Sequence, residues 1–150
     1  MATRALRIRP ARDRDYEAIA EHSGQLGYTA SAAETRERLL RIGADGNQAV
    51  FVAESESAVV GWVHVFESQR IESRPFAEVG GLVVAEGART RGVGRSLMSS
   101  AEDWARSRGL ERLRARSNVM RSGAHRFYER LGYRSSKRQS CFEKQLENPD

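Results

Sequence analysis

The chain has 150 residues, which suffices for one domain with a single hydrophobic core. Hydrophobic residues make up 39% and charged residues 30%, which excludes a disordered chain, and no apolar run reaches the length of a membrane span. The net charge of +5 comes mainly from arginines scattered along the chain, a pattern that favours a phosphate-bearing small molecule over nucleic acid as the partner.

The first half of the chain predicts a strand, two helices and a hairpin. Alternating apolar residues indicate a strand at residues 6–9, ended by Pro10. Asp13 is suited to cap the first helix, and the pair Ser31 and Glu34 forms a capping box for the second. Two apolar runs joined by a polar turn then predict an antiparallel hairpin of residues 49–53 and 58–66.

The second half predicts the remaining elements in this order: a strand at residues 76–84, a helix between Gly94 and Gly109, a strand at residues 110–119, a helix at residues 122–131 ended by Gly132, and a closing hairpin of Tyr133 and residues 139–146. No repeat or long linker divides the chain, so residues 1–150 are predicted to form a single domain.

A few residue types carry weak signals. The single cysteine, Cys141, rules out an internal disulfide and fits a reducing cytoplasm; it is interpreted as structural because no second residue supports it as a nucleophile. The N-terminus has no apolar block of signal-peptide length, which also favours the cytoplasm. His22, His64 and His125 lack partner groups and are interpreted as structural, and no cluster has metal-ligand spacing, so no metal is expected.

The loop at residues 89–94 joins a strand to the start of a helix. The first N–H groups of a helix have no internal partners, and the helix dipole places positive charge there, so such a loop is suited to bind an anion. Gly92 and Gly94 lack a Cβ atom, which lets a phosphate approach the backbone, and Arg89 and Arg91 add positive charge. The loop therefore predicts a site for the pyrophosphate of a nucleotide-like cofactor.

Two familiar phosphate loops do not match this segment. Leu97 stands where the dinucleotide fingerprint needs its third glycine, and Val93 stands where the P-loop needs lysine. The remaining pattern, Arg-x-x-Gly-x-Gly after a strand ending Leu-x-Val, resembles the GNAT superfamily of N-acetyltransferases. Residues 121–133 resemble the other GNAT signature, Ala-x-x-(aliphatic or aromatic)-Tyr-x-x-x-Gly-(Phe/Tyr).

The resemblance extends over nearly the whole chain and implies a GNAT-like α/β (mixed α+β) fold, with helices on both faces of a central mixed sheet and the order β-α-α-β-β-β-α-β-α-β-β. It implies that acetyl-CoA is the cosubstrate. Many relatives carry asparagine at the position of Arg121, so the polar contact falls either to Asn118 or to Arg121 itself. The residues expected to bind the cofactor are Leu82, Val83, Val84, Arg89, Thr90, Arg91, Gly92, Val93, Gly94, Arg95, Ser96, Asn118, Arg121 and Tyr128.

Amine acetylation requires a group that takes the proton of the amine and donors for the developing oxyanion and the leaving thiolate. Glu78 is the best-placed carboxylate for the base, directly or through water, with a solvated strand residue as the alternative. The resemblance implies that Tyr128 is the acid; a packing aromatic is the alternative. Gly80 and Gly81 invite a bulge that would splay a pair of parallel strands and turn the N–H groups of residues 82–84 toward the cofactor.

The leading hypothesis is therefore an N-acetyltransferase that moves an acetyl group from acetyl-CoA to a primary amine by direct transfer in a ternary complex. The acceptor, a small-molecule amine or an amine of a peptide or protein, would lie under the first two helices. Carboxylates there either attract a cationic amine or form the solvated face of a helix; they are Asp13, Asp15, Glu17 and Glu21. The alternatives are a non-catalytic GNAT module that binds acyl-CoA and, less favoured, a basic nucleic-acid-associated protein. A homodimer is left open.

Overall fold

The computed structural model describes residues 5–25, 27–89, 92–116 and 122–148. They fall into two compact units, residues 1–116 and residues 117–150. The elements of the first unit are β1 (Leu6–Pro10), η1 (Asp13–Asp15), α1 (Tyr16–Gln25), α2 (Ala32–Gly43), β2 (Gln48–Ser55), β3 (Ala58–Arg70), β4 (Ser73–Val84), η2 (Glu86–Ala88), α3 (Val93–Ser107) and β5 (Leu113–Ala115). The second unit contains α4 (Ser122–Arg130).

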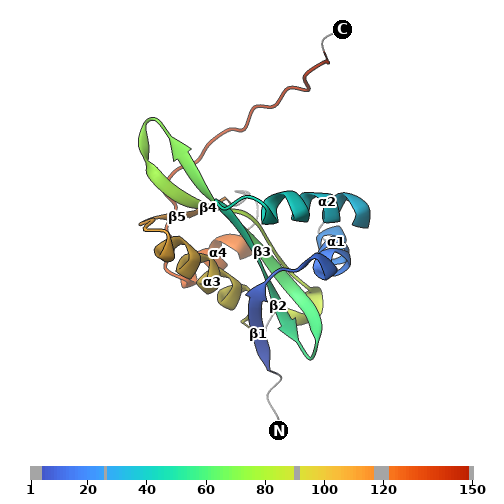
Figure 1. The fold of residues 1–150 in the computed structure, drawn as a ribbon. Coiled ribbons are helices and arrows are strands. Elements are labelled where there is room, and N and C mark those ends of the chain that lie inside the picture. Colours follow the sequence, from blue (N-terminus) through green and yellow to red (C-terminus); the bar gives the residue numbers. More distant parts are fainter. Residues whose placement is uncertain (1–4, 26, 90–91, 117–121, 149–150) are drawn as a thin grey trace. The chain divides into compact units, whose positions relative to one another are not determined.

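The five strands form one sheet in the order β1-β2-β3-β4-β5 (Figure 1). The first three pairings are antiparallel, and β4 pairs with β5 in parallel. Helix α3 connects these two parallel strands, as the sequence predicts. The mixed α/β fold is thereby confirmed.

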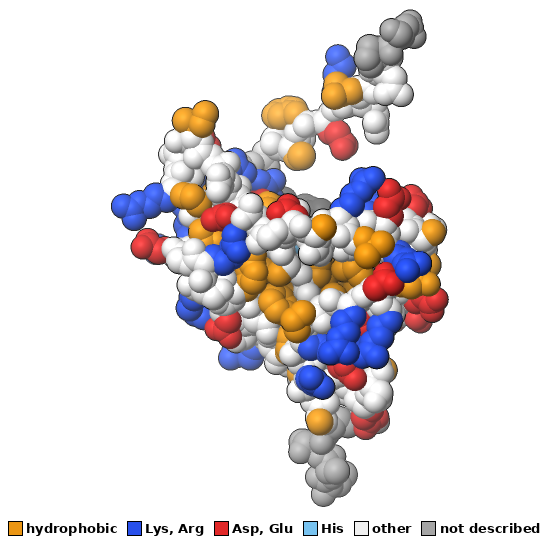
Figure 2. Space-filling model, viewed as in Figure 1, with side chains coloured by type: hydrophobic (Ala, Val, Ile, Leu, Met, Phe, Trp, Pro, Cys, Tyr) orange, Lys and Arg blue, Asp and Glu red, His pale blue; other side chains and the backbone are white. Residues whose placement is uncertain are grey.

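Helices cover both faces of the sheet (Figure 1). Helix α3 packs across β1 to β4, and α1 and α2 lie against the opposite face. The core under α3 consists of small and branched side chains that alternate along the strands with residues of the other face; its buried members include Ala53, Val63, Val65, Ala77, Val93, Leu97, Ala101 and Ala105. In Figure 2 hydrophobic side chains gather over the strands, with charged side chains around them.

Local signals account for the helix starts and ends. The capping box of α2 is present, with the Glu34 N–H donating to the Ser31 hydroxyl at 3.1 Å and the Ser31 N–H donating to the Glu34 carboxylate at 3.0 Å. Gly109 follows α3 at a φ of 75°, and Gly132 follows α4 at a φ of 91°, which are left-handed conformations that glycine adopts without strain.

Two predicted strand segments are wrong. The strand expected at residues 110–119 is reduced to Leu113–Ala115, with residues 117–119 outside the described residues. The closing hairpin is absent, since residues 134–148 form neither helix nor strand. That stretch is almost wholly polar, and its large apolar residues, Phe142 and Leu146, are 93% and 84% exposed, so it has no alternating apolar face to bury.

Candidate active site

The pairing of β4 with β5 comprises three residue pairs among the described residues. Their ladder runs from Ala77 opposite Leu113 to Val79 opposite Ala115 and ends there. One residue further along β4, the register with β3 shifts, because His64 faces Gly81 while Val65 faces Val79. Gly80 is therefore the extra residue of a bulge, as the sequence predicts. Beyond it, β4 continues without a partner on the β5 side among the described residues.

The two bulge positions have room only for glycine. A Cβ atom on Gly80 would lie 2.5 Å from Nδ1 of His64, and one on Gly81 would lie 2.8 Å from the Trp62 ring. Side chains of β3 thus fill the space beside the bulge. The position of the bulge in β4 is therefore fixed by its packing against His64 and Trp62 of β3.

The edge of β4 beyond the bulge offers backbone groups to a ligand. The Ala85 N–H donates to the Val60 carbonyl on β3 at 2.8 Å. Because alternate residues of a strand direct their backbone groups to opposite edges, Leu82 and Val84 direct theirs to the edge away from β3. The Val84 carbonyl accepts a bond from Nε of Arg89 at 3.4 Å, in agreement with this direction.

Helix α3 begins just beyond this edge. Gly92 precedes its first residue in a left-handed conformation, with φ 73° and ψ 16°, and a Cβ atom there would meet no atom of the described residues within 4 Å. The Ser96 N–H donates to the Gly92 carbonyl at 3.1 Å. Helix geometry leaves the preceding amides, those of Val93, Gly94 and Arg95, without intrahelical acceptors. The helix start is thus open and suited to an anion.

Glu78 lies two residues before the bulge and is 8% exposed, so its interpretation as a solvated strand residue is wrong. Nε of Arg116 donates to its Oε1 at 3.2 Å. Phe76, Glu78 and Gly80 alternate along β4, which places them on the face opposite the α3 core. Glu78 therefore lies on the same face as the His64 ring that packs against Gly80.

The comparisons with known proteins identify the family. The family model described as "Acetyltransferase (GNAT) family" matches residues 11–133. The chain belongs to the GNAT acetyltransferase family. It is thus an acyltransferase. The uncharacterized N-acetyltransferase YhdJ of Bacillus subtilis is 40% identical over 53 residues, which span 35% of this chain and 37% of that protein.

Solved structures share this GNAT fold at low identity. The aminoglycoside N-acetyltransferase AAC(6')-Iy in complex with CoA has a TM-score of 0.87 at 17% identity, covering 97% of this chain and 98% of that one. Glucosamine-6-phosphate N-acetyltransferase from Arabidopsis thaliana has a TM-score of 0.81 at 20% identity, covering 94% and 99%. A transcriptional regulator from Bacillus halodurans C-125 has a TM-score of 0.84 at 23% identity, covering 93% and 100%.

The second GNAT motif lies in the other compact unit. On α4 the rings of Phe127 and Tyr128 meet edge to face at 5.1 Å, and Tyr128 and Tyr133 do so at 5.8 Å. Burial raises the pKa of Tyr128 above its ordinary value of 10.0, so its phenol keeps its proton at neutral pH. The role of Tyr128 toward the cofactor stays a prediction. Thr90, Arg91, Asn118 and Arg121 lie outside the described residues.

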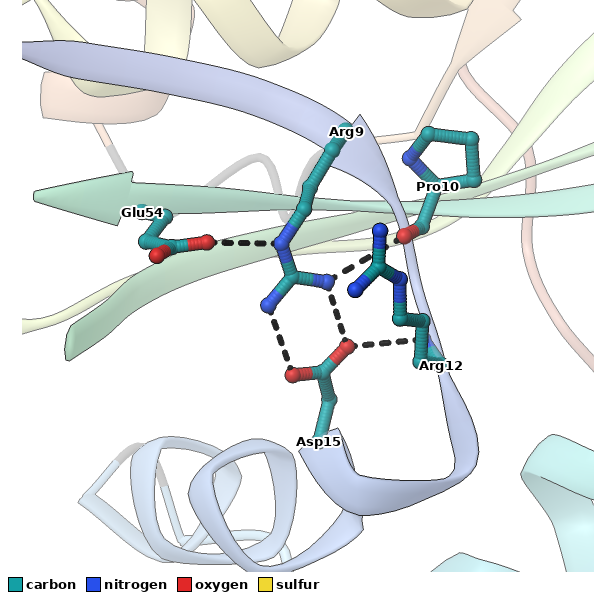
Figure 3. Close-up of polar contacts among 5 residues, drawn as sticks. All are labelled: Arg9, Pro10, Arg12, Asp15 and Glu54. Atoms are coloured by element: carbon teal, nitrogen blue, oxygen red, sulfur yellow. Dashed lines mark hydrogen bonds and ion pairs between the residues drawn. The ribbon is translucent and has the colours of Figure 1, made fainter. Parts of the chain in front are cut away.

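Two carboxylates expected near the acceptor are held in ion pairs. Arg9 donates two bonds to Asp15 at 2.8 and 2.9 Å, and its Nε donates to Glu54 at 2.7 Å (Figure 3). Burial alone would raise the pKa of Asp15, but the bonds from Arg9 and from the Arg12 N–H outweigh it and hold that pKa below its ordinary value. Asp15 is 4% exposed, so the alternative prediction that it lies on a solvated helix face is wrong. Asp13, the second of the two, pairs with Arg36 at 2.8 Å.

His64 packs beside the Gly80 bulge and has a polar partner on β2, which agrees with its interpretation as structural. Its Nε2 lies 2.7 Å from Oε1 of Gln48, and its ring lies 5.5 Å from that of Phe66. Burial lowers its pKa below 6.5, so the ring is neutral at pH 7. The sequence shows a histidine in one predicted strand and the pair Gly80 and Gly81 in the next. The register that places His64 beside these glycines is not visible in the sequence.

The other weak signals resolve as follows. His22 lies 2.7 Å from the Val59 carbonyl through Nε2 and so fastens α1 to β3, which is a structural role. Cys141 is exposed and lies outside any strand, so a packing role for it is wrong. Among the described residues, no group of three or more His, Cys, Asp or Glu is arranged to hold a metal ion. Within the same residues, every helix is too short or too polar to span a membrane.

Proposed function

We propose that the chain transfers an acetyl group from acetyl-CoA to the primary amine of an acceptor, directly, within a ternary complex. The observation that carries this proposal is the Gly80 bulge of β4, followed by a strand edge at Leu82 and Val84 with no β5 partner among the described residues and by the start of α3 after Gly92. Two proteins of similar fold are described as N-acetyltransferases of amine compounds, an aminoglycoside and glucosamine-6-phosphate, which supports an amine acceptor.

The residues around the gap fit acetyl-CoA. The amides of Val93, Gly94 and Arg95 would bind its pyrophosphate, and the open space above Gly92 leaves room for a phosphate to approach. Arg89, together with Thr90, Arg91 and Ser96 of the same segment, would add charge and hydrogen bonds. The edge of residues 82–84 would pair with the pantetheine arm as an added strand does.

When bound, acetyl-CoA supplies a thioester carbonyl that the amine attacks, with departure of the CoA thiolate. A backbone N–H at the exposed β4 edge, that of Leu82 or Val84, would stabilise the negative charge that develops on the carbonyl oxygen. Glu78 would take a proton from the ammonium group of the acceptor, directly or through water, so that the neutral amine can attack, because an amine with a pKa of about 10.4 is protonated at neutral pH. Tyr128 would donate its proton to the thiolate, and Asn118 or Arg121 would add a polar contact to the cofactor.

A thiol-release assay tests this proposal. Acetyl-CoA is mixed with the protein and a panel of primary amines, and free CoA thiol is measured over time beside a binding titration with CoA alone. Amine-dependent release supports the transferase. CoA binding without release from any amine would favour the non-catalytic module, and absence of both would overturn the site. Glu78→Gln should lower turnover, whereas Glu37→Gln, on the exposed face of α2, should not.

A further inference from the structure

Phe76 on β4 lies beneath three guanidinium groups. The ring is fully buried, and the guanidinium carbons of Arg70, Arg112 and Arg114 lie 5.6, 4.7 and 4.4 Å from its centroid. The three arginines come from the end of β3, from the residue before β5 and from β5 itself. One ring thus holds three positive charges close together, in a geometry that cation–π attraction favours.

The charge of this arginine cluster (Arg70, Arg112 and Arg114) is not neutralised within its own unit, over the described residues from 5 to 116. Their neighbours Arg74 and Arg116 each have a carboxylate of that unit within 4 Å, at 3.9 Å and 3.2 Å. Among the same described residues, no ion pair joins a member of the cluster to a carboxylate of the first unit. Like charges held this close repel one another, and an anion placed among them removes that repulsion.

The cluster lies on the face of the sheet that carries Glu78, the proposed base. Phe76 shares this face with Glu78 and Gly80, and Arg114 lies directly opposite Glu78 in the β4–β5 ladder. Phe76 and Glu78 are two residues apart, which is about 7 Å along a strand. The positive charge, the Glu78 carboxylate and the bulge therefore follow one another along β4 toward the proposed cofactor edge at Leu82 and Val84.

Two of the four carboxylates near α1, those of Asp13 and Asp15, are already engaged by arginines and offer no free charge to a polycation. Asp13 is paired with Arg36 at 2.8 Å, and Asp15 with Arg9 at 2.8 Å. The acceptor face thus presents unneutralised arginine, while its nearby aspartates are already paired. An acceptor with several positive charges would be repelled by this arrangement.

We infer that the acceptor carries an anionic group, a carboxylate or a phosphate, in addition to the amine that is acetylated. Arg112 and Arg114, with Arg70 beside them, bind that group through planar guanidinium contacts, and the amine lies toward Glu78 and the bulge. This inference rests on the proposed function, because it assumes that an amine is acetylated at the gap.

The test compares acceptors that differ only in the anionic group. Glucosamine 6-phosphate is measured against glucosamine, and leucine against leucinamide, by thiol release from acetyl-CoA and by calorimetric binding to the CoA-saturated protein. The acidic member of at least one pair should bind and react about tenfold better or more. Which pair shows the difference separates phosphate from carboxylate.

Substitutions in the arginine cluster test whether it causes the preference for acidic acceptors. Arg112→Met and Arg114→Met keep an apolar stem over Phe76, and each should abolish most of the acidic preference through a rise in KM with little change in kcat. Arg112→Lys, which keeps the charge, should retain some of it. Arg41→Met, on α2 and paired with Glu37, should leave the preference unchanged. Equal use and equal binding of acidic and neutral members, or a preference that survives both methionine variants, overturns the inference. Selective binding without turnover would overturn the proposed function and leave the anion site standing.

Discussion

Gly92 and Gly109 provide a matched pair that separates backbone strain from cofactor binding. They precede and follow the same helix, α3, with φ angles of 73° and 75°. At both positions a Cβ atom would meet nothing within 4 Å in the part of the chain that the structure describes. Replacing either glycine by alanine therefore creates no clash and exerts its effect on stability through the left-handed conformation alone.

The expected effect on stability is the same at the two positions. A residue with a side chain costs about 1–2 kcal/mol in the left-handed region, and the stiffer unfolded chain returns about 0.4–1 kcal/mol. Gly92→Ala and Gly109→Ala should each lower the free energy of unfolding by about 1 kcal/mol, which corresponds to a fall in Tm of about 2–4 °C for a chain of this length.

The effect on cofactor affinity should differ between them. A methyl group at residue 92 stands where a phosphate would approach the first amides of α3. Loss of one hydrogen bond to a charged group costs about 1.5–3 kcal/mol, which raises the Kd for CoA roughly tenfold or more. Calorimetric titration of both variants with CoA, beside thermal unfolding, measures the two effects. Equal CoA affinity for Gly92→Ala and Gly109→Ala would refute the assignment of the phosphate site to this helix start.

Three further predictions concern the acid, the buried ion pair and the bulge. Tyr128→Phe should lower kcat about a hundredfold or more while changing CoA affinity little; normal turnover in the thiol-release assay would remove its role as the acid. Asp15→Asn should lower the free energy of unfolding, measured with urea at pH 7, by about 3 kcal/mol, because the buried guanidinium of Arg9 loses one of its two carboxylate partners. Because the folded state lowers the pKa of Asp15, its contribution is present above about pH 4 and is lost as the pH falls through the folded value, so the variant should lose less stability on acidification; equal acid sensitivity would contradict this. Gly80→Ala should cost about 1–3 kcal/mol because its methyl group meets His64, and should lower kcat/KM, whereas Gly46→Ala, which meets nothing within 4 Å, should do neither.

Features fixed by neighbouring residues could be predicted from the sequence. The start of α3 was predicted from glycines placed just before an amphipathic helix, and the structure has the helix starting after a left-handed Gly92; binding of an anion there stays a prediction. Two consecutive glycines in a strand predicted the bulge, and the register places it at Gly80. The capping box of Ser31 and Glu34 is a short local signal of the same kind.

Features that join distant segments of the chain could not be predicted from the sequence. The part-buried hydrogen bond between Arg116 and Glu78 joins residues 38 positions apart, and that between Arg9 and Glu54 joins residues 45 positions apart. Neither pair forms a recognisable sequence motif. The arginine cluster over Phe76 likewise depends on the β4–β5 register. The closing hairpin was predicted from Tyr133 and the run of residues 139–146, although the polar composition of residues 134–148 does not favour a strand.

The most direct test is a titration of ¹⁵N-labelled protein with CoA, followed through the backbone amide chemical shifts. Binding of the pyrophosphate at the start of α3 and of the pantetheine arm along β4 predicts the largest shifts at Val93, Gly94 and Arg95, with further shifts at Leu82 and Val84. Saturable CoA binding that leaves the amides of all these residues unchanged would contradict the site.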